Sequence, residues 1–189
     1  MAKKVIALTG GIGCGKSTAG RFFLRQGFCV LDCDKISAEV ATDCDVLDEI
    51  CKTFGNRFVV DGMLDRRALA VEVFTDKQKT QQLNKIFHPR ILQKLKEKID
   101  DTEGVVFVEI PLLEDGVSQW FDEIWLFEAQ KQKILERVFA RDNRTEEQVQ
   151  AILDRQSAYS ALSNVLVVNN DGTQQEFEQK LSALLQKIV

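Results

Sequence analysis

The stretch GGIGCGKST, from Gly10 to Thr18, decides how the chain folds. It holds four glycines, one lysine and two hydroxyl side chains, and it follows the apolar run Val5–Leu8. Its spacing, GxxxxGKS, is the pattern of a phosphate-binding loop. Glycines allow such a loop to curl until consecutive backbone N–H groups converge on one phosphate, and the next helix adds the positive end of its dipole. The stretch therefore predicts a strand, a phosphate-binding loop and a helix, with a nucleoside triphosphate as ligand.

Single residues of this loop have separate predicted roles. Lys16 supplies a mobile charge for the β- and γ-phosphates, and the Ser17 hydroxyl is a ligand for Mg²⁺. A position near a helix N-terminus could lower the pKa of the Cys14 thiol, so Cys14 is interpreted first as a small loop residue and second as a site of oxidation. The residues predicted to contact the nucleotide in the loop are Gly11, Ile12, Gly13, Cys14, Gly15, Lys16, Ser17 and Thr18.

Short β-rich runs alternate with longer segments of helical period, which predicts an α/β fold with a mostly parallel sheet. The predicted strands are residues 5–9, 28–31, 105–110, 124–127 and 165–168. Residues 34–101 show helical patterns and no convincing strand, which predicts an inserted helical lobe; Pro89 is expected to kink or divide its longest helix. The pairs Thr145/Gln148 and Thr173/Glu176 each fit a reciprocal capping pattern and predict two helix starts.

Composition limits the class of protein. The chain has 189 residues with 44% hydrophobic and 29% charged residues, which suits one globular domain with an inserted lobe. A net charge of −4 and a pI near 5.2 disfavour a general nucleic-acid binder. The first apolar run is too short for a signal peptide or a membrane span. Five cysteines without CxxC spacing predict a reduced, cytoplasmic protein, and a single histidine argues against a zinc site.

Acidic residues follow two of the predicted strands. Asp32 and Asp34 flank one residue at the end of the second strand, where ligands of open α/β sheets collect. Such a pair can accept the proton of an attacking hydroxyl or hold Mg²⁺ through water. The alternative is that one of the two caps the next helix. Glu109, at the end of the third strand, is a further candidate for the acidic group that helps to hold Mg²⁺.

Two arginines share one face of a predicted helix. Arg137 and Arg141 are four residues apart, and like charges at this spacing cost an isolated helix about 0.2–0.5 kcal/mol. An anion between them would reverse that sign, and the guanidinium fork suits phosphate. The alternative is a solvated face on which Glu136 and Asp142 balance the two arginines.

Taken in order along the chain, these motifs resemble those of bacterial dephospho-coenzyme A kinases over essentially the full length. The matching stretches are ALTGGIGCGKST, VLDCDKISAEV, DGMLDRRALAVEVF, LNKIFHPRI, IPLLE, ARDNRTEEQV, ILDRQ and VVNN. The resemblance implies a nucleoside-monophosphate-kinase-like core whose five-stranded parallel sheet has the order 2-3-1-4-5. It also implies a helical coenzyme A-binding lobe over residues 34–101 and a lid over residues 130–158. The implied reaction transfers the γ-phosphoryl group of ATP to the ribose 3′-hydroxyl of dephospho-CoA.

The resemblance assigns roles to particular residues. Asp34 is the implied base near the acceptor hydroxyl and Asp32 its support, while Arg141, and next Arg137, stabilises charge on the transferring group. Asn169 matches an asparagine near the nucleotide base. The implied substrate contacts are Thr9, Asp34, Leu83, His88, Pro111 and Leu112. From the residues alone, a lone histidine such as His88 is more often a structural hydrogen-bonding group than a catalyst.

The implied small molecules are ATP, Mg²⁺ and dephospho-CoA, with no nucleic acid and no membrane, and the protein is expected to be a monomer or a small homo-oligomer. Two alternatives stay open at this point. A GTPase-type switch would need a guanine-reading Asn-Lys-x-Asp, but Asn84-Lys85 is followed by Ile86-Phe87. Another small-molecule kinase of the same fold is the closer alternative, because spacing alone does not identify the acceptor.

Overall fold

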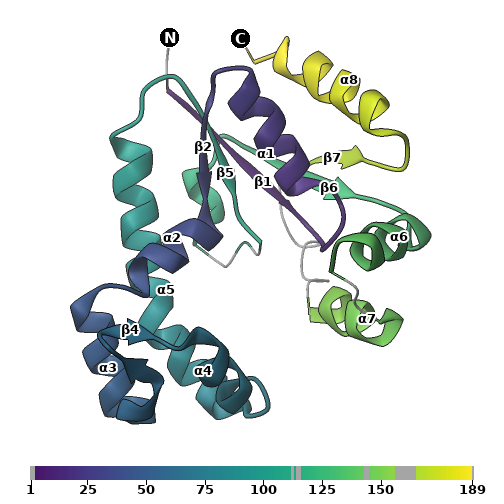
Figure 1. The fold of residues 1–189 in the computed structure, drawn as a ribbon. Helices are drawn as coiled ribbons and strands as arrows, with labels where there is room; N and C mark the ends of the chain where they lie inside the picture. Colours follow the sequence, from purple (N-terminus) through teal and green to yellow (C-terminus); the bar gives the residue numbers. More distant parts are fainter. Residues whose placement is uncertain (1–2, 112, 114–115, 143–144, 156–164, 189) are drawn as a thin grey trace. The chain divides into compact units, whose positions relative to one another are not determined.

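The computed structural model describes residues 3–111, 113, 116–142, 145–155 and 165–188 of the chain (Figure 1). The chain divides into two compact units, one formed by Met1–Leu31 with Thr102–Val189 and the other by Asp32–Asp101.

The first unit is built on a five-stranded parallel sheet. Its strands are β1 (Lys4–Gly10), β2 (Cys29–Asp32), β5 (Val105–Glu109), β6 (Glu123–Glu128) and β7 (Val165–Asn169). The spatial order is β2-β5-β1-β6-β7, which is the predicted order 2-3-1-4-5 when only these five strands are numbered along the chain. Every predicted strand is confirmed to within one residue at each end.

The central strand β1 pairs in parallel with β5 on one side and β6 on the other, with Ile6 opposite both Phe107 and Glu123. Its residues Ile6–Leu8 are fully buried, as are Val106–Val108 of β5. Continuous burial of this kind arises when helices cover both faces of a parallel sheet, and it explains why these strands read as unbroken apolar runs.

Four α-helices belong to the described part of this unit: α1 (Lys16–Arg25), α6 (Lys131–Asp142), α7 (Glu146–Arg155) and α8 (Gln174–Leu185), with the short 3₁₀-helix η2 (Ser118–Trp120). Both predicted capping pairs are confirmed. Thr145 N donates to Gln148 Oε1 at 3.0 Å and Gln148 N donates to Thr145 Oγ1 at 3.4 Å. Thr173 and Glu176 form the same reciprocal pair at the start of α8.

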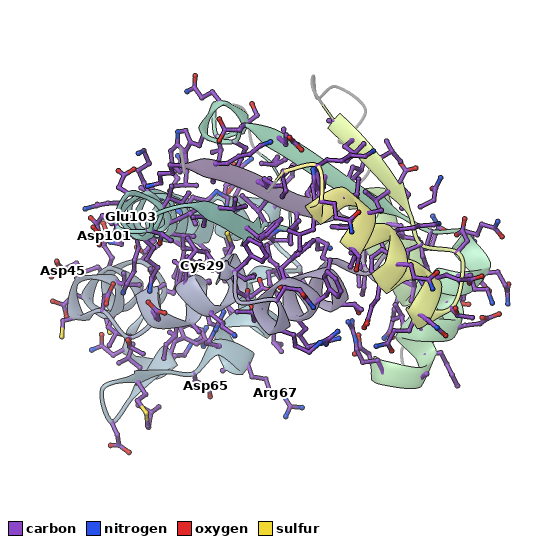
Figure 2. The ribbon with its side chains drawn as sticks, turned by 90° about the horizontal axis from the view of Figure 1, so that it is seen from above. Cys29, Asp45, Asp65, Arg67, Asp101 and Glu103 are labelled. Atoms are coloured by element: carbon purple, nitrogen blue, oxygen red, sulfur yellow. The ribbon has the colours of Figure 1, made fainter. Side chains whose placement is uncertain are left out.

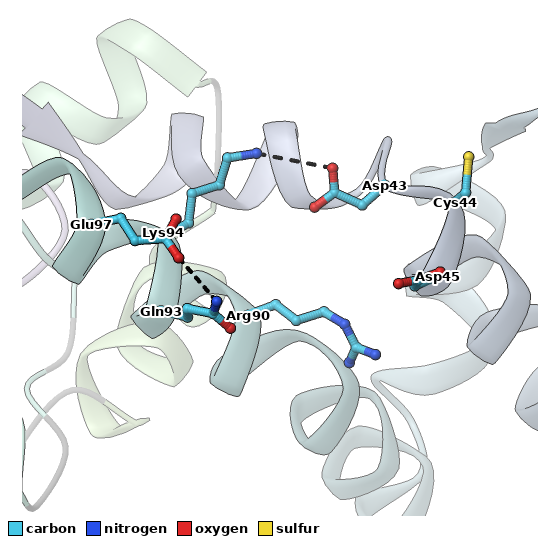
Figure 3. Close-up of a pocket in the computed structure, with 7 residues that line it drawn as sticks. All are labelled: Asp43, Cys44, Asp45, Arg90, Gln93, Lys94 and Glu97. Atoms are coloured by element: carbon cyan, nitrogen blue, oxygen red, sulfur yellow. Dashed lines mark hydrogen bonds and ion pairs between the residues drawn. The ribbon is translucent and has the colours of Figure 1, made fainter.

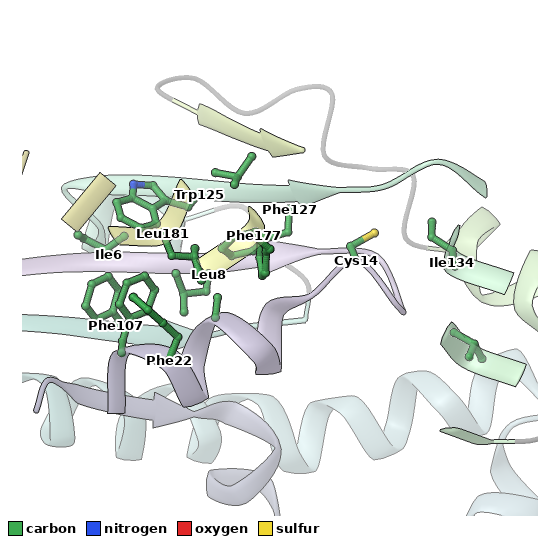
Figure 4. Close-up of a cluster of buried hydrophobic side chains, with 14 of the residues drawn as sticks. Ile6, Leu8, Cys14, Phe22, Phe107, Trp125, Phe127, Ile134, Phe177 and Leu181 are labelled. Carbon is green, nitrogen blue, oxygen red and sulfur yellow. The ribbon is translucent and has the colours of Figure 1, made fainter. Parts of the chain in front are cut away.

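Aromatic side chains dominate the core of this unit (Figure 4). The rings of Phe23 and Phe107 stack with their centroids 3.9 Å apart, and Trp125 lies 5.8 Å from both. Cys14 belongs to the same buried cluster, together with Ile134 of α6. The phosphate-binding loop is therefore anchored in the hydrophobic core through one of its own side chains.

The second unit is mainly helical, with α2 (Cys33–Val40), α3 (Cys44–Phe54), α4 (Arg66–Val73) and α5 (Lys77–Asp100), and α5 contacts the other three. Its 3₁₀-helix η1 covers Asn56–Phe58. Figure 2 shows Asp65 and Arg67 at the start of α4, where Asp65 Oδ1 accepts a hydrogen bond from Ala68 N at 2.9 Å. The expected helical character of this segment is confirmed.

One detail of this unit differs from the sequence-based expectation. Strands β3 (Val59–Val60) and β4 (Met63–Leu64) form a small antiparallel hairpin where no strand was expected. Both residues of its turn, Asp61 and Gly62, have positive φ, as in the tight turns that join such strands. Strands of two residues are too short to produce an alternating pattern, so they cannot be predicted from the sequence.

Pro89, which was expected to kink or divide the longest helix, lies inside α5 and does not divide it. Proline removes one backbone donor and crowds the carbonyl groups of the preceding turn. Arg90 Nη1 donates to Ile86 O at 2.8 Å, so a side chain supplies a hydrogen bond in the disturbed turn. None of the described helices is both long and apolar enough to cross a membrane.

Candidate active site

The loop between β1 and α1 has the backbone that its glycines permit. Gly10, Gly13 and Gly15 have φ values of 136°, 73° and 111°, a region that residues with a Cβ rarely adopt. Neighbouring elements also exclude a side chain there. A Cβ on Gly13 would lie 3.0 Å from Val138 Cγ2 in α6, and one on Gly10 would overlap the Phe127 carbonyl of β6. The predicted loop is thus wrapped closely by two other parts of the unit.

Donors from three elements hold the loop carbonyls. Lys16 Nζ donates to Gly10 O and, at 3.1 Å, to Gly11 O. Arg137 Nη1 donates to Gly13 O at 3.3 Å, and the side-chain amide of Asn170 donates to Cys14 O at 2.9 Å. In a trans peptide the C=O and N–H bonds point in opposite directions, so fixing a carbonyl on one side presents the next N–H on the other. This arrangement can bind a phosphate through backbone amides.

Asn170 was missed by sequence reasoning, which named its neighbour Asn169. The side chain of Asn170 is 6% exposed, whereas Asn169 is exposed and its carbonyl accepts a hydrogen bond from Lys180 Nζ at 2.8 Å. The sequence carried no clear signal, because residues 165–168 are all apolar and do not show which face of the strand is covered. Side chains alternate along a strand, so Asn170 shares the face of the buried Val168, two residues earlier.

The two arginines of α6 have different surroundings. Arg137 is directed to the loop and also donates through Nη2 to Asn170 O at 2.8 Å and to Asn170 Oδ1 at 3.3 Å. Arg141 is exposed and forms two 2.7 Å hydrogen bonds with Asp142, which raise the pKa of its guanidinium. For Arg141 the structure therefore matches the alternative of a solvated, balanced face. Glu136 does not balance either arginine, because it pairs with Lys133.

The Cys14 thiol does not have the lowered pKa that its position suggested. Burial raises its pKa above the ordinary value, and the nearby Lys16 ammonium opposes this only in part. Cys14 is 4% exposed, so desolvation of the thiolate outweighs the helix end and the lysine. The first interpretation of Cys14, a small loop residue, agrees with this burial, whereas the second, a thiol prone to oxidation through a lowered pKa, does not.

The acidic pair begins α2 in the second unit. Asp32 is the N-cap of this helix, and its Oδ1 accepts hydrogen bonds from Asp34 N at 2.9 Å and Lys35 N at 3.3 Å. The alternative weighed above, that one aspartate is a helix cap, is thus confirmed for Asp32. Asp34 lies in the first turn with its side chain exposed, and it forms no ion pair or side-chain hydrogen bond within the described part of the chain. The cap therefore fixes the backbone that carries Asp34.

The predicted substrate contacts are scattered over the two units. Thr9 in β1 is 0% exposed, and its hydroxyl has no hydrogen-bond partner among the described residues. Pro111 is exposed just after β5, whereas Leu83 and His88 are half-buried in α5. Leu112 lies outside the described residues. Because its side chain is fully buried, Thr9 is not accessible to a ligand in this conformation.

Glu109 at the end of β5 lies against α1. A Cβ on Gly20 would be 2.7 Å from Glu109 Cδ and 3.2 Å from its Cγ, and closer still to Oε1. Gly20 follows Ser17 by three residues, so the two share one side of α1. Glu109 and the exposed hydroxyl of Ser17 are therefore candidate oxygen ligands on one side of this helix. Within the described ranges no group of three or more acidic, histidine or cysteine side chains forms a ready-made metal site.

A separate hollow of about 440 Å³ lies in the second unit (Figure 3). Its lining is Asp43, Cys44, Asp45, Arg90, Gln93, Lys94 and Glu97. The lining carries charges of both signs: Lys94 pairs with Asp43 at 3.9 Å, and Arg90 pairs with Glu49, outside the lining, at 2.8 Å. Such a lining does not select an anion, and we assign this hollow no ligand.

The chain is similar to known proteins over most of its length. The family model described as CoaE, dephospho-CoA kinase, matches residues 4–176. A dephospho-CoA kinase of Fusobacterium nucleatum is 33% identical, with 95% of this chain and 96% of the relative covered, and one of Shouchella clausii is 34% identical at the same coverage.

Among solved structures, TT1252 from Thermus thermophilus superposes with a TM-score of 0.82 at 32% identity, covering 100% of both chains. The dephospho-CoA kinase from Campylobacter jejuni has a TM-score of 0.69 at 26% identity, covering 98% of this chain and 97% of that one. A shikimate kinase from Acinetobacter baumannii, with a TM-score of 0.56 at 16% identity over 97% of this chain and 93% of its own, shares the fold.

Proposed function

Because the chain belongs to the dephospho-CoA kinase family, we propose that it transfers the γ-phosphoryl group of ATP to the ribose 3′-hydroxyl of dephospho-CoA, giving coenzyme A and ADP. The observation that carries the proposal is the loop Gly10–Lys16, whose carbonyls are held by Lys16, Arg137 and Asn170. A loop fixed in this way suits the phosphates of a nucleotide, and the family supplies the acceptor.

The chemistry that the protein must provide is positioning and charge stabilisation. The loop amides and the Lys16 ammonium bind the phosphates, and Lys16 moves from the carbonyls of Gly10 and Gly11 to the nucleotide. The exposed carboxylate of Asp34 accepts the proton of the attacking hydroxyl, and Asp32 holds the helix start that carries it. The exposed Arg141 leaves its partner Asp142 and stabilises charge on the transferring group, while Arg137 stays at the loop.

The residues present also suit Mg²⁺. The Ser17 hydroxyl and the Glu109 carboxylate are hard oxygen ligands of the kind this ion prefers, directly or through water. When bound, Mg²⁺ would neutralise charge on the β- and γ-phosphates.

Residues 34–101 bind the coenzyme A portion of the substrate, and Leu83 and His88 within them contact it. Pro111 and Leu112, outside this range, contact the substrate as well. Asn169 lies near the nucleotide base. Residues 130–158 act as a lid that excludes water, because water near the γ-phosphate competes with the acceptor. We place the enzyme in the cytoplasm as a monomer or small homo-oligomer, acting on small molecules and on neither nucleic acid nor membrane.

A coupled assay of ADP release tests the acceptor. Dephospho-CoA, adenosine, nucleoside monophosphates, shikimate and gluconate are offered separately with ATP and Mg²⁺, and only dephospho-CoA is expected to support turnover. Equal turnover with any other member of the panel would overturn the assignment.

The same assay tests the base. Asp34→Asn should lower kcat by roughly two to four decades, because the amide cannot accept the proton. Asp45→Asn is the matched control, since Asp45 is an exposed aspartate at the corresponding position in the first turn of α3. Unchanged kcat in Asp34→Asn would remove this residue from the mechanism.

A further inference from the structure

We infer that Asn170 is a positioning residue for phosphoryl transfer: its side-chain amide holds the Cys14–Gly15 peptide so that the Gly15 N–H faces the bound phosphate. This inference deepens the proposed function and rests on it. It concerns how the loop is aimed, and it assigns Asn170 no contact with substrate.

The first step is the geometry of one peptide. Asn170 Nδ2 donates to Cys14 O at 2.9 Å, and the bond joins residues 156 positions apart in the sequence. The loop peptides are trans, so a carbonyl held toward Asn170 turns the Gly15 N–H to the opposite side. Gly15 is the N-cap residue of α1, so its N–H belongs to the helix N-terminus, where backbone amides bind phosphates.

The second step is that the orientation of the amide is fixed. Arg137 Nη2 donates to Asn170 Oδ1 at 3.3 Å and to Asn170 O at 2.8 Å, while Asn170 N donates to Glu128 O at 2.8 Å. The oxygen of the carboxamide therefore faces a donor, and its nitrogen must face Cys14. With the side chain 6% exposed, water does not easily replace this hydrogen bond.

The third step is the fit between Asn170 and Gly15. A Cβ on Gly15 would overlap Asn170 Nδ2 and would lie 3.2 Å from Phe177 Cε1. The φ of 111° already favours glycine at this position. Asn170 thus occupies the space that a side chain at position 15 would need. Gly15 and Asn170 together fix the orientation of the Gly15 backbone amide.

Two variants of similar size test the inference. Asn170→Leu removes the donor without adding charge, and Asn170→Asp keeps an oxygen for Arg137 but replaces the donor by an acceptor. Their shared defect is an unsatisfied carbonyl at Cys14. We expect both to weaken the binding of ADP, measured by titration calorimetry, by about ten- to a hundred-fold. We also expect kcat to fall and the KM for ATP to rise, while the KM for dephospho-CoA at saturating ATP stays within about two-fold.

Gln179→Glu is the control for a change from amide to carboxylate, because Gln179 is exposed on α8 and away from the loop. A purely structural role would lower the melting temperature of the variants while the folded protein kept its ADP affinity, and that result would overturn the inference. If the leucine variant does not fold, the aspartate variant decides alone. Wild-type protein that binds ADP but does not turn over dephospho-CoA would refute the proposed function. In that case the ADP affinities of the wild type and the Asn170 variants, compared by calorimetry, would still test the role of Asn170.

Discussion

Glu109 of β5 lies so close to Gly20 of α1 that it leaves no room for a side chain at position 20. Gly20 lies inside α1, where alanine normally stabilises a helix by about 1 kcal/mol relative to glycine. Here the added Cβ would come within 2.7 Å of Glu109 Cδ and closer to Oε1, so the Glu109 side chain must rotate away. A forced side-chain rotation costs about 0.5–1.5 kcal/mol, before any lost interaction of the carboxylate is counted.

The two effects oppose each other, so Gly20→Ala should leave the free energy of unfolding close to that of the wild type. In a Glu109→Ala background the obstacle is gone, and the same substitution should stabilise the protein by about 1 kcal/mol, or roughly 2–4 °C in melting temperature. The coupling between the two sites should therefore be about 0.5–1.5 kcal/mol, the cost of rotating the Glu109 side chain. Thermal unfolding of the four proteins, followed by circular dichroism, measures this cycle.

The same proteins also test the proposed role of Glu109 in binding Mg²⁺. If Glu109 helps to hold Mg²⁺, Gly20→Ala should raise the Mg²⁺ concentration needed for half-maximal activity, as should Glu109→Gln. An equal rise in melting temperature in both backgrounds would refute the packing argument, and an unchanged Mg²⁺ requirement would remove Glu109 from the metal site.

Two further predictions follow from single side chains. Thr9→Val should raise the free energy of unfolding by about 1–2 kcal/mol, because valine has nearly the same shape and removes a buried hydroxyl that has no partner among the described residues; a loss of turnover without any gain in melting temperature would instead support a ligand contact. Arg141→Lys should lower kcat because the guanidinium fork is lost, while the KM for ATP changes little since Arg137 holds the loop; an unchanged kcat would leave Arg141 as the surface residue that its pair with Asp142 describes.

Features decided by neighbours in the sequence could be predicted. The spacing of Gly10, Gly15 and Lys16 specifies the loop, and the pair Thr173/Glu176 specifies a helix start, since each depends on atoms only a few residues apart. The apolar runs placed all five strands of the sheet because parallel strands are buried on both faces. The resemblance then gave the strand order, which periodicity alone does not contain.

Features that depend on distant segments could not be predicted. The side chain that holds Cys14 O comes from Asn170, and the choice between Asn169 and Asn170 depends on which face of β7 is covered. The pKa of Cys14 is raised, whereas its place at a helix end suggested a lowered pKa. Burial by other elements outweighs the nearby positive charges.

Consecutive residues were enough to specify the phosphate-binding loop of this α/β kinase fold, since the loop needs only neighbouring residues with the right backbone freedom. What surrounds that loop depends on the folded chain: Arg137 at its carbonyls while Arg141 faces solvent, and Glu109 in the space that Gly20 leaves. Backbone conformation is set over a few residues, whereas burial and hydrogen bonding at a site are set by segments that meet only when the chain folds.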